Sequence, residues 1–185
     1  MKIVILGAKG MLAQSLQVAL LENTSREIFS FARDRIDVTN PEMIKCELDQ
    51  IQADYIVNCT AYTNIDLAES EEEKVFAIND KAVMNLVEYL KDKNIPLVYF
   101  SADHIFAGDK SSGYLEEDFS FAPQTVYGKS KLAGELNIKN NLEKYYLIRT
   151  SWLYGPYGKN FVKTMLRTTD KIDELKVVFF AEIQK

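Results

Sequence analysis

The sequence predicts an α/β fold in which helices flank a doubly wound parallel sheet. Short apolar runs alternate with longer amphipathic stretches along the 185 residues. Most of these runs are unbroken rather than alternating, which is typical of strands that are covered on both faces. The first run leads directly into a glycine turn, as in parallel sheets that bind a dinucleotide. Together these observations favour a Rossmann-like sheet.

Six apolar runs are the expected strands: Lys2–Leu6, Glu27–Ala32, Tyr55–Cys59, Pro96–Ser101, Tyr146–Thr150 and Lys176–Ala181. Five amphipathic stretches are the expected helices: Gly10–Leu21, Pro41–Gln52, Glu71–Lys93, Tyr127–Asn140 and Lys159–Thr168. Pro41 suits the first turn of its helix, with Thr39 or Asn40 as the cap. The segment Asp103–Thr125 has no periodicity, so we expect a loop beside the site.

Composition narrows the classes of function. The formal net charge is −5 and there is no block of Lys or Arg, so we expect neither nucleic acid nor anionic membrane as a partner. The apolar start is too short for a signal peptide, and no run approaches the ~20 residues of a membrane span, so a cytoplasmic protein is expected. Cys46 and Cys59 form no C-x-x-C pair and have no histidine nearby, which predicts buried thiols and no metal site.

The glycine turn has the spacing G-x-x-G-x-x-A from Gly7 to Ala13. Gly7 and Gly10 permit a tight turn and a close approach of the backbone to a pyrophosphate at the helix N-terminus. An ordinary βα turn is the alternative, but the position directly after an apolar strand favours the cofactor. After the second strand, Arg33 could pair with the 2′-phosphate of NADP, although a solvated surface arginine is an equal alternative.

Tyr127 and Lys131 lie four residues apart on one expected helix, so their side chains share a face. A nearby ammonium favours the phenolate, and we therefore expect Lys131 to lower the pKa of Tyr127 toward neutral. That change would make the phenol an effective proton donor or acceptor. A solvated helix face is the alternative for a Y-x-x-x-K spacing that stands alone.

Four segments that follow one another in order carry a resemblance to a known family: VNCTAYTNIDLAESEEEKVFAIND, FSADHIFAG, LEEDFSFAPQTVYGKSKLAGE and IRTSWLYGPYGKNFVKTML. Together they resemble the dTDP-4-dehydrorhamnose reductases, a branch of the extended short-chain dehydrogenase/reductases, as far as about Val178. The resemblance implies reduction of the 4-keto group of dTDP-4-dehydro-L-rhamnose with NADPH or NADH. It also implies a nucleotide-sugar partner and leaves a homodimer open.

By position, the resemblance implies roles for individual residues. With Arg33, the implied cofactor contacts are Gly7, Gly10, Met11, Leu12, Asp37, Val38, Ala61, Tyr62, Thr63 and Lys131. The implied substrate contacts are Ala102, Asp103, Tyr127 and Trp152. Tyr127 resembles the proton donor to the C4 oxygen, and Lys131 would hold the nicotinamide ribose. For Trp152 a core aromatic is the alternative. For Asp66, Glu69 and 71–73 we expect only an acidic helix N-terminus.

The chain departs from this family at the end of the expected fourth strand. The family usually has Ser-Thr-Asp-Tyr, whereas this chain has Ser101-Ala102-Asp103-His104, so the catalytic hydroxyl of the threonine is replaced by a methyl group. Losing one donor to an oxyanion typically costs about 10²–10³ in rate. Ser101 is the candidate catalytic replacement, although adjacent strand residues point to opposite faces. His104 is a second candidate, with a partly exposed loop residue as the favoured interpretation.

We expect residues 1–185 to form an NAD(P)-binding Rossmann-like domain in which 152–185 begin a substrate-binding region. The family's small C-terminal substrate domain is expected to be largely missing from this chain. Two other functions stay open at this point. One is a non-catalytic NADP-binding regulatory module or an inactive gene fragment, and the other is a nucleotide-sugar epimerase or dehydratase of the same family.

Overall fold

The computed structural model describes residues 1–22 and 25–169, so the expected strand Lys176–Ala181 lies outside the described residues. One sheet holds five parallel strands: β1 (Lys2–Leu6), β2 (Glu27–Phe31), β3 (Tyr55–Asn58), β4 (Leu97–Ala102) and β5 (Tyr145–Thr150). The helices are α1 (Met11–Leu21), α2 (Pro41–Leu48), α3 (Ile65–Ala68), α4 (Glu72–Phe76), α5 (Ala82–Leu90), α6 (Val126–Asn141) and α7 (Phe161–Thr169). A π-helical turn, η1 (Ala77–Lys81), joins α4 to α5, and a 3₁₀ turn, η2 (Asp103–Ile105), follows β4.

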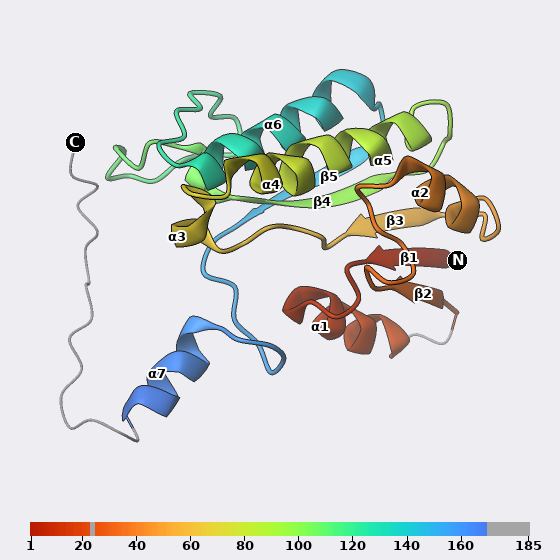
Figure 1. Ribbon diagram of the computed structural model, residues 1–185, viewed down its shortest axis with the longest axis horizontal. Helices are drawn as coiled ribbons and strands as arrows, with labels where there is room; N and C mark the ends of the chain where they lie inside the picture. Colours follow the sequence, from red (N-terminus) through yellow and green to blue (C-terminus); the bar gives the residue numbers. More distant parts are fainter. Residues whose placement is uncertain (23–24, 170–185) are drawn as a thin grey trace.

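The predicted doubly wound parallel sheet is confirmed. Figure 1 shows α2, α5 and α6 on one face of the sheet and α1 on the other. The strand order is β2-β1-β3-β4-β5, so the order reverses between β1 and β3. In open sheets of this kind, ligands bind beyond the carboxyl ends of the strands at this reversal. The topology therefore places the glycine turn after β1 at the expected ligand position.

Apolar residues of the strands build a core on each side of the sheet. The larger core lies under α2, α5 and α6 and includes Val4, Ile56 and Leu97, while Ile5 and Val57 pack toward α1. Most of the strands were expected to be covered on both faces, and β5 departs from this pattern. Tyr146 and Ile148 are 55% and 41% exposed, because β5 is an edge strand of the described sheet and only its other face lies in the larger core.

The expected helix Glu71–Lys93 is one continuous helical stretch that contains the π-helical turn. Such turns are frequent at functional sites because they displace the chain by one residue. Here the turn carries the buried Asn79, whose side chain accepts a hydrogen bond from the Tyr62 backbone N–H at 2.8 Å and donates to the Tyr62 carbonyl at 3.1 Å. Asn79 also donates to Ser130 Oγ of α6 at 3.0 Å. The turn therefore ties α6 to the segment after β3.

Two glycines allow α6 to approach its neighbours closely. A Cβ atom at Gly134 would stand 2.3 Å from the Asn79 carbonyl oxygen and 2.7 Å from the Tyr99 hydroxyl. A Cβ atom at Gly128 would stand 2.2 Å from the His104 carbonyl oxygen. Real Cβ atoms do not tolerate such distances, so α6 rests directly on β4, η1 and η2.

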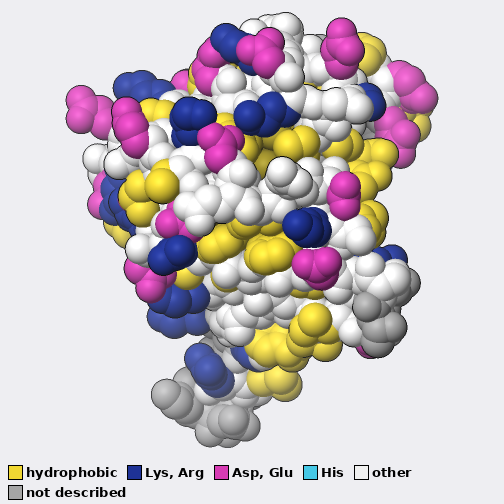
Figure 2. Space-filling model, turned by 90° about the vertical axis from the view of Figure 1, so that its right-hand side faces the viewer, with side chains coloured by type: hydrophobic (Ala, Val, Ile, Leu, Met, Phe, Trp, Pro, Cys, Tyr) yellow, Lys and Arg dark blue, Asp and Glu magenta, His cyan; other side chains and the backbone are white. Residues whose placement is uncertain are grey.

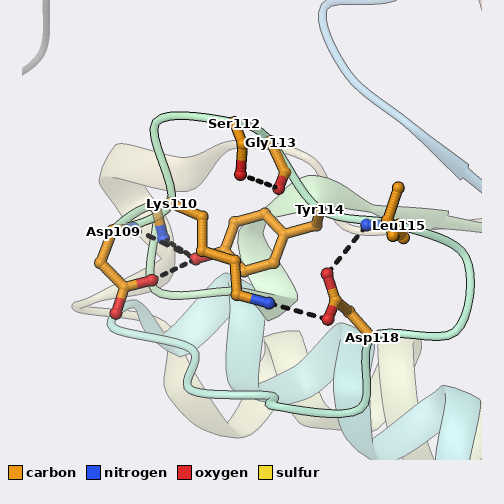
Figure 3. A network of polar contacts seen from close by, with 8 residues as sticks. Asp109, Lys110, Ser112, Gly113, Tyr114, Leu115 and Asp118 are labelled. Atoms are coloured by element: carbon orange, nitrogen blue, oxygen red, sulfur yellow. Dashed lines mark hydrogen bonds and ion pairs between the residues drawn. The ribbon is translucent and has the colours of Figure 1, made fainter.

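The segment Asp103–Thr125 is a loop as predicted, apart from η2. Side chains within the loop give it a defined shape (Figure 3). The Tyr114 hydroxyl accepts hydrogen bonds from the backbone N–H groups of Gly108 and Asp109 and donates to the Asp109 carboxylate at 2.6 Å. Lys110 Nζ lies over the Tyr114 ring and pairs with Asp118 at 2.7 Å.

Figure 2 shows the side of the molecule at the amino-terminal ends of the strands. Basic and acidic side chains are interspersed over this face, so charge of one sign does not dominate it. No helix within residues 1–22 and 25–169 is long and apolar enough to cross a membrane.

Candidate active site

Two cavities of about 540 Å³ and 750 Å³ lie along the carboxyl ends of the strands. They share four lining residues: Gly10, Cys59, Thr60 and Ala61. Because these residues follow β1 and β3, the two cavities form one groove across the reversal in strand order. A groove at this position can hold an elongated ligand such as a dinucleotide.

The glycine turn forms the floor where the two cavities meet. Gly7 has φ +82°, and the N–H groups of Gly7 and Ala8 both donate to the Phe31 carbonyl at 2.9 Å. Gly10 donates to the Gly7 carbonyl at 2.8 Å, and α1 begins at the next residue, Met11. The first turn of α1 therefore faces the groove, which suits an anionic group such as a pyrophosphate.

Arg33, Asp37 and Val38 line the second cavity, as the sequence predicts for contacts to the adenosine end of a cofactor. Arg33 Nε lies 2.9 Å from Asp37 Oδ2, and the Arg33 side chain is 74% exposed. Although burial acts to raise the pKa of Asp37, hydrogen bonds from Thr39 and the Arg33 guanidinium hold it below its ordinary value. An ionised Asp37 therefore neutralises part of the charge of Arg33.

Tyr127 and Lys131 both line the first cavity from α6, together with Ser101, Ala102 and Asp103 at the end of β4. The helix begins with Thr125, whose side chain accepts a hydrogen bond from the Gly128 N–H at 3.0 Å. The candidate catalytic residues are thus brought together by one strand end and one helix. The solvated helix face that was the alternative for Tyr127 and Lys131 is wrong.

Two acidic residues also fix this part of the structure. Glu69 Oε1 accepts a hydrogen bond from the Val126 N–H at 2.9 Å, at the start of α6. Glu71 accepts from the Tyr62 hydroxyl at 2.6 Å. Glu71 is the N-cap of α4, with Glu72 and Glu73 in the first turn, so the expected acidic helix N-terminus is confirmed there. Glu69 instead ends α3, and its contact with α6 was not expected.

The predicted effect of Lys131 on Tyr127 is also wrong. Burial, and then the Asp103 carboxylate, raise the pKa of Tyr127 to about 12. Lys131 is only 2% exposed, and its Nζ donates to the Phe100 carbonyl at 2.7 Å. Burial lowers the pKa of Lys131 to about 7, although the Glu135 carboxylate opposes this shift. A lysine that is partly neutral near pH 7 and bonded to the backbone cannot stabilise a phenolate strongly.

At the end of β4, Ser101 carries a hydroxyl group, whereas Ala102 carries only a methyl group. The Ala102 methyl group lines the cavity where the family resemblance predicts a hydroxyl. Ser101 is 4% exposed, and its buried hydroxyl has no hydrogen-bond partner among the described residues. By strand alternation it shares the face of Tyr99, which packs in the core beneath α6. An unpaired buried hydroxyl is costly, so Ser101 Oγ is available to a further partner.

Asp103 and Trp152 both line the first cavity. Ser151 Oγ donates to Asp103 Oδ2 at 2.6 Å, which holds the carboxylate beside the end of β5. Trp152 has φ +50° and is 75% exposed, with its ring in edge contact with Phe161 at 5.1 Å. Trp152 is therefore not the core aromatic that was the alternative. A strained backbone at a bulky residue often marks a functional site.

Some predicted positions differ from the structure, and some lining residues were missed. The Tyr62 side chain packs with Ala68, Val75 and Val126 rather than lining either cavity, although Ala61 and Thr63 do line the first. Cys46 is exposed rather than buried, whereas burial raises the pKa of Cys59 to about 12. Lining residues of the first cavity that the sequence did not suggest are Asn58, Cys59, Thr60, Ile65, Phe100, Thr150, Ser151, Leu153, Gly158 and Lys159. Their positions in the sequence could have indicated them, because most of them lie at or just after the carboxyl end of a predicted strand.

No group of three or more His, Cys, Asp or Glu side chains suited to a metal ion occurs in the described part of the chain.

A family model described as "RmlD substrate binding domain" matches residues 1–180. The chain belongs to the RmlD substrate-binding domain family. The resemblance read from the sequence is thereby confirmed at the level of the family.

Relatives of this RmlD-family chain agree with that assignment. It is 38% identical to the dTDP-4-dehydrorhamnose reductase of Aggregatibacter actinomycetemcomitans over 177 residues, which cover 96% of this chain and 60% of that protein. It is similar to the crystal structure of dTDP-4-dehydrorhamnose reductase from Bacillus anthracis in complex with NADP, with a TM-score of 0.88 and 38% identity over 92% of this chain and 60% of that one. It is also similar to the crystal structure of a dTDP-4-dehydrorhamnose reductase from Clostridium acetobutylicum, with a TM-score of 0.91 and 35% identity over 96% of this chain and 62% of that one. The chain thus spans about three fifths of the length of these relatives.

The buried Lys131 of this RmlD-family chain makes its stability depend on pH. The folded-state pKa of about 7 lies below the unfolded value, so above pH 7 the unfolded chain binds more protons than the folded chain. Losing the Lys131 proton on folding then lowers the free energy of unfolding, and this loss becomes smaller as pH rises. We expect the unfolding free energy of the wild type, minus that of Lys131→Met, to rise by up to about 1.4 kcal/mol per pH unit between about pH 7.5 and 9. Urea unfolding at several pH values measures this difference, and a difference independent of pH would contradict the burial of Lys131.

Proposed function

We propose that this chain carries the cofactor-binding and catalytic part of a dTDP-4-dehydrorhamnose reductase. The reaction is the reduction of the 4-keto group of dTDP-4-dehydro-L-rhamnose to dTDP-L-rhamnose, with NADPH as the reductant. One observation carries the proposal: Tyr127, Lys131 and Asp103 line a cavity that continues into the groove at the glycine turn. Relatives that match 96% of this chain bear the name of this reductase, which supports the choice of substrate.

The residues of the groove fit NADPH. A Cβ atom at Gly7 would meet the Cys59 backbone at 3.1 Å, so only glycine keeps the turn open for a pyrophosphate. Arg33 would meet the 2′-phosphate, and Asp37 and Val38 would meet the adenosine. The Bacillus anthracis relative, which is solved with NADP, supports this choice of cofactor. When bound, the cofactor supplies the hydride that reaches the sugar C4.

Tyr127 donates its phenolic proton to the C4 oxygen as the hydride reaches the carbon. With a pKa of about 12 the phenol remains protonated near neutral pH, which suits an acid that acts in the direction of reduction. Lys131 would hold the nicotinamide ribose from the next turn of the same helix. Ser101, whose buried hydroxyl is unpaired, would supply the second donor to the oxygen.

Trp152 and Asp103 would position the sugar nucleotide at the rim of the cavity. Leu153, Gly158 and Lys159 line the same cavity, which supports a substrate-binding region that starts near residue 152. The methyl group of Ala102 faces this cavity in place of a hydroxyl, so we infer that reduction by this chain is slow.

The same methyl group favours one other function, a non-catalytic NADPH-binding module that regulates another enzyme. Such a module would keep the groove of the glycine turn and would not need a complete set of donors to the C4 oxygen. The two functions differ in turnover, since a binding module would not oxidise NADPH with any sugar nucleotide.

The proposed contact of Arg33 predicts a cofactor preference. We expect Arg33→Ala to weaken NADPH binding by about tenfold and to leave NADH binding nearly unchanged, because only NADPH carries the 2′-phosphate. Fluorescence titration of both cofactors measures the two dissociation constants. Arg35→Ala is the matched control, because Arg35 is also exposed and ion-paired, with Glu47, but does not line the cavity. Equal effects of the two substitutions would rule out the proposed contact.

The proposed reaction predicts the order of three rates. We expect slow NADPH oxidation by the unaltered chain with dTDP-4-dehydro-L-rhamnose, an increase of up to about 10²-fold in Ala102→Thr, and loss of the reaction in Tyr127→Phe. The absorbance of NADPH follows all three, and cofactor titration checks that each variant still binds. If the chain and Ala102→Thr react at the same rate, the inferred impairment is wrong. If NADPH binds but none of the variants reacts, the binding module is favoured instead.

A further inference from the structure

We propose that His104, in its protonated form, stabilises the phenolate that Tyr127 becomes when it gives up its proton, and so makes this step depend on pH. His104 acts through Tyr127 and is therefore a positioning residue. The inference rests on the proposed role of Tyr127 as the proton donor. The single histidine of this chain stands where the family resemblance predicts a tyrosine.

The first support is the contact between the two rings. His104 and Tyr127 lie edge to face, with ring centroids 5.5 Å apart and an interplanar angle of 79°. Both residues line the first cavity, so the imidazole lies at the site of the reaction rather than behind it.

The second support is that the backbone holds His104 firmly in this position. The 3₁₀ turn is closed by the Phe106 N–H, which donates to the Asp103 carbonyl at 3.0 Å. The Ile105 carbonyl accepts from the Ala122 N–H at 3.1 Å, which fixes the far side of the turn. Because Gly128 has no side chain, the His104 carbonyl lies directly against the first turn of α6. The backbone of His104 is therefore held against α6 by packing and hydrogen bonds.

The third support is the balance of charge around Tyr127. The charged groups that line the first cavity with His104 and Tyr127 are Asp103, Lys131 on α6 and Lys159. Asp103 is an anion and disfavours a phenolate. Lys131 is buried, and its Nζ donates to the Phe100 carbonyl. His104 is the one of these groups whose ring is in contact with the Tyr127 ring, so an imidazolium there would offset the phenolate.

Tyr127, the hydride from the cofactor and solvent together account for every atom that moves in this step. The O–H bond of Tyr127 breaks as a new O–H bond forms on the C4 oxygen, while the carbon gains the hydride. The phenolate that is left takes a proton from solvent before the next cycle. Histidine changes charge between about pH 5 and 8, so the stabilisation is present at the acidic end of this range and is lost as pH rises.

The test replaces Tyr127 with a tetrafluorinated tyrosine, whose phenol is much more acidic than that of tyrosine, so that it ionises near neutral pH despite its burial. Fluorine NMR then follows this phenol alone, without substrate or cofactor. We expect His104→Gln to raise the phenol pKa by about 0.5 to 2, the range for a unit charge at this separation between strong and weak screening. His104→Tyr, which restores the residue of the family, should raise it as well. Lys129→Gln, which removes an exposed cation from α6, is the control and should leave it nearly unchanged.

The same coupling must appear in the imidazole, because the interaction of two titrating groups is reciprocal. The single histidine gives one set of imidazole proton signals, so its pKa is read without assignment. We expect this pKa to be higher with the fluorinated phenolate at position 127 than in Tyr127→Phe, by the same amount. Unchanged pKa values for both groups would overturn the proposal. The proposed reductase function fails separately, if Tyr127→Phe oxidises NADPH as fast as the unaltered chain.

Discussion

The close packing of α6 on β4 and on the π-helical turn is the constraint on which the rest of the site depends. Gly134 leaves room for the Asn79 carbonyl and the Tyr99 hydroxyl, and Gly128 leaves room for the His104 carbonyl. This packing buries Lys131 so completely that its ordinary positive charge becomes unfavourable. It also places Tyr127, on the preceding turn of α6, at the end of β4. One steric arrangement therefore determines both the position and the charge of the two candidate catalytic residues.

Asn79 connects this packing to the cofactor groove. Its side chain holds the backbone of Tyr62 and the hydroxyl of Ser130, which itself donates to the Tyr127 carbonyl at 2.7 Å. A chain of hydrogen bonds thus runs from the segment after β3 to the candidate proton donor. A displacement of α6 would break bonds at both ends, so groove and catalytic helix are held as one unit.

Much of this architecture could be predicted from the sequence, because it follows from short-range patterns. Unbroken apolar runs correctly predicted five parallel strands, and the position of Gly7 directly after β1 correctly predicted the turn at the groove. The helix spacing of Tyr127 and Lys131 correctly placed both in one cavity. These features depend on periodicity and on the meeting of carboxyl ends at one edge of a parallel sheet.

What the sequence could not predict depends on depth of burial and on distant contacts. The sign of the pKa shift at Tyr127 was wrong because spacing does not reveal that the Lys131 side chain is buried and donates to the Phe100 carbonyl. Tyr62 was assigned to the cofactor, yet its hydroxyl donates to Glu71 and its side chain packs in a separate apolar cluster. Glu69 reads as a helix-end acid, and only the fold shows that it caps the start of α6.

The central claim is that one groove carries the cofactor to Tyr127. A crystal structure of this chain with NADPH tests it most directly. The account predicts that the nicotinamide lies in the first cavity beside Tyr127 and Lys131, with the adenosine 2′-phosphate beside Arg33 in the second. A nicotinamide bound beside Arg33, or a cofactor bound outside both cavities, would contradict it.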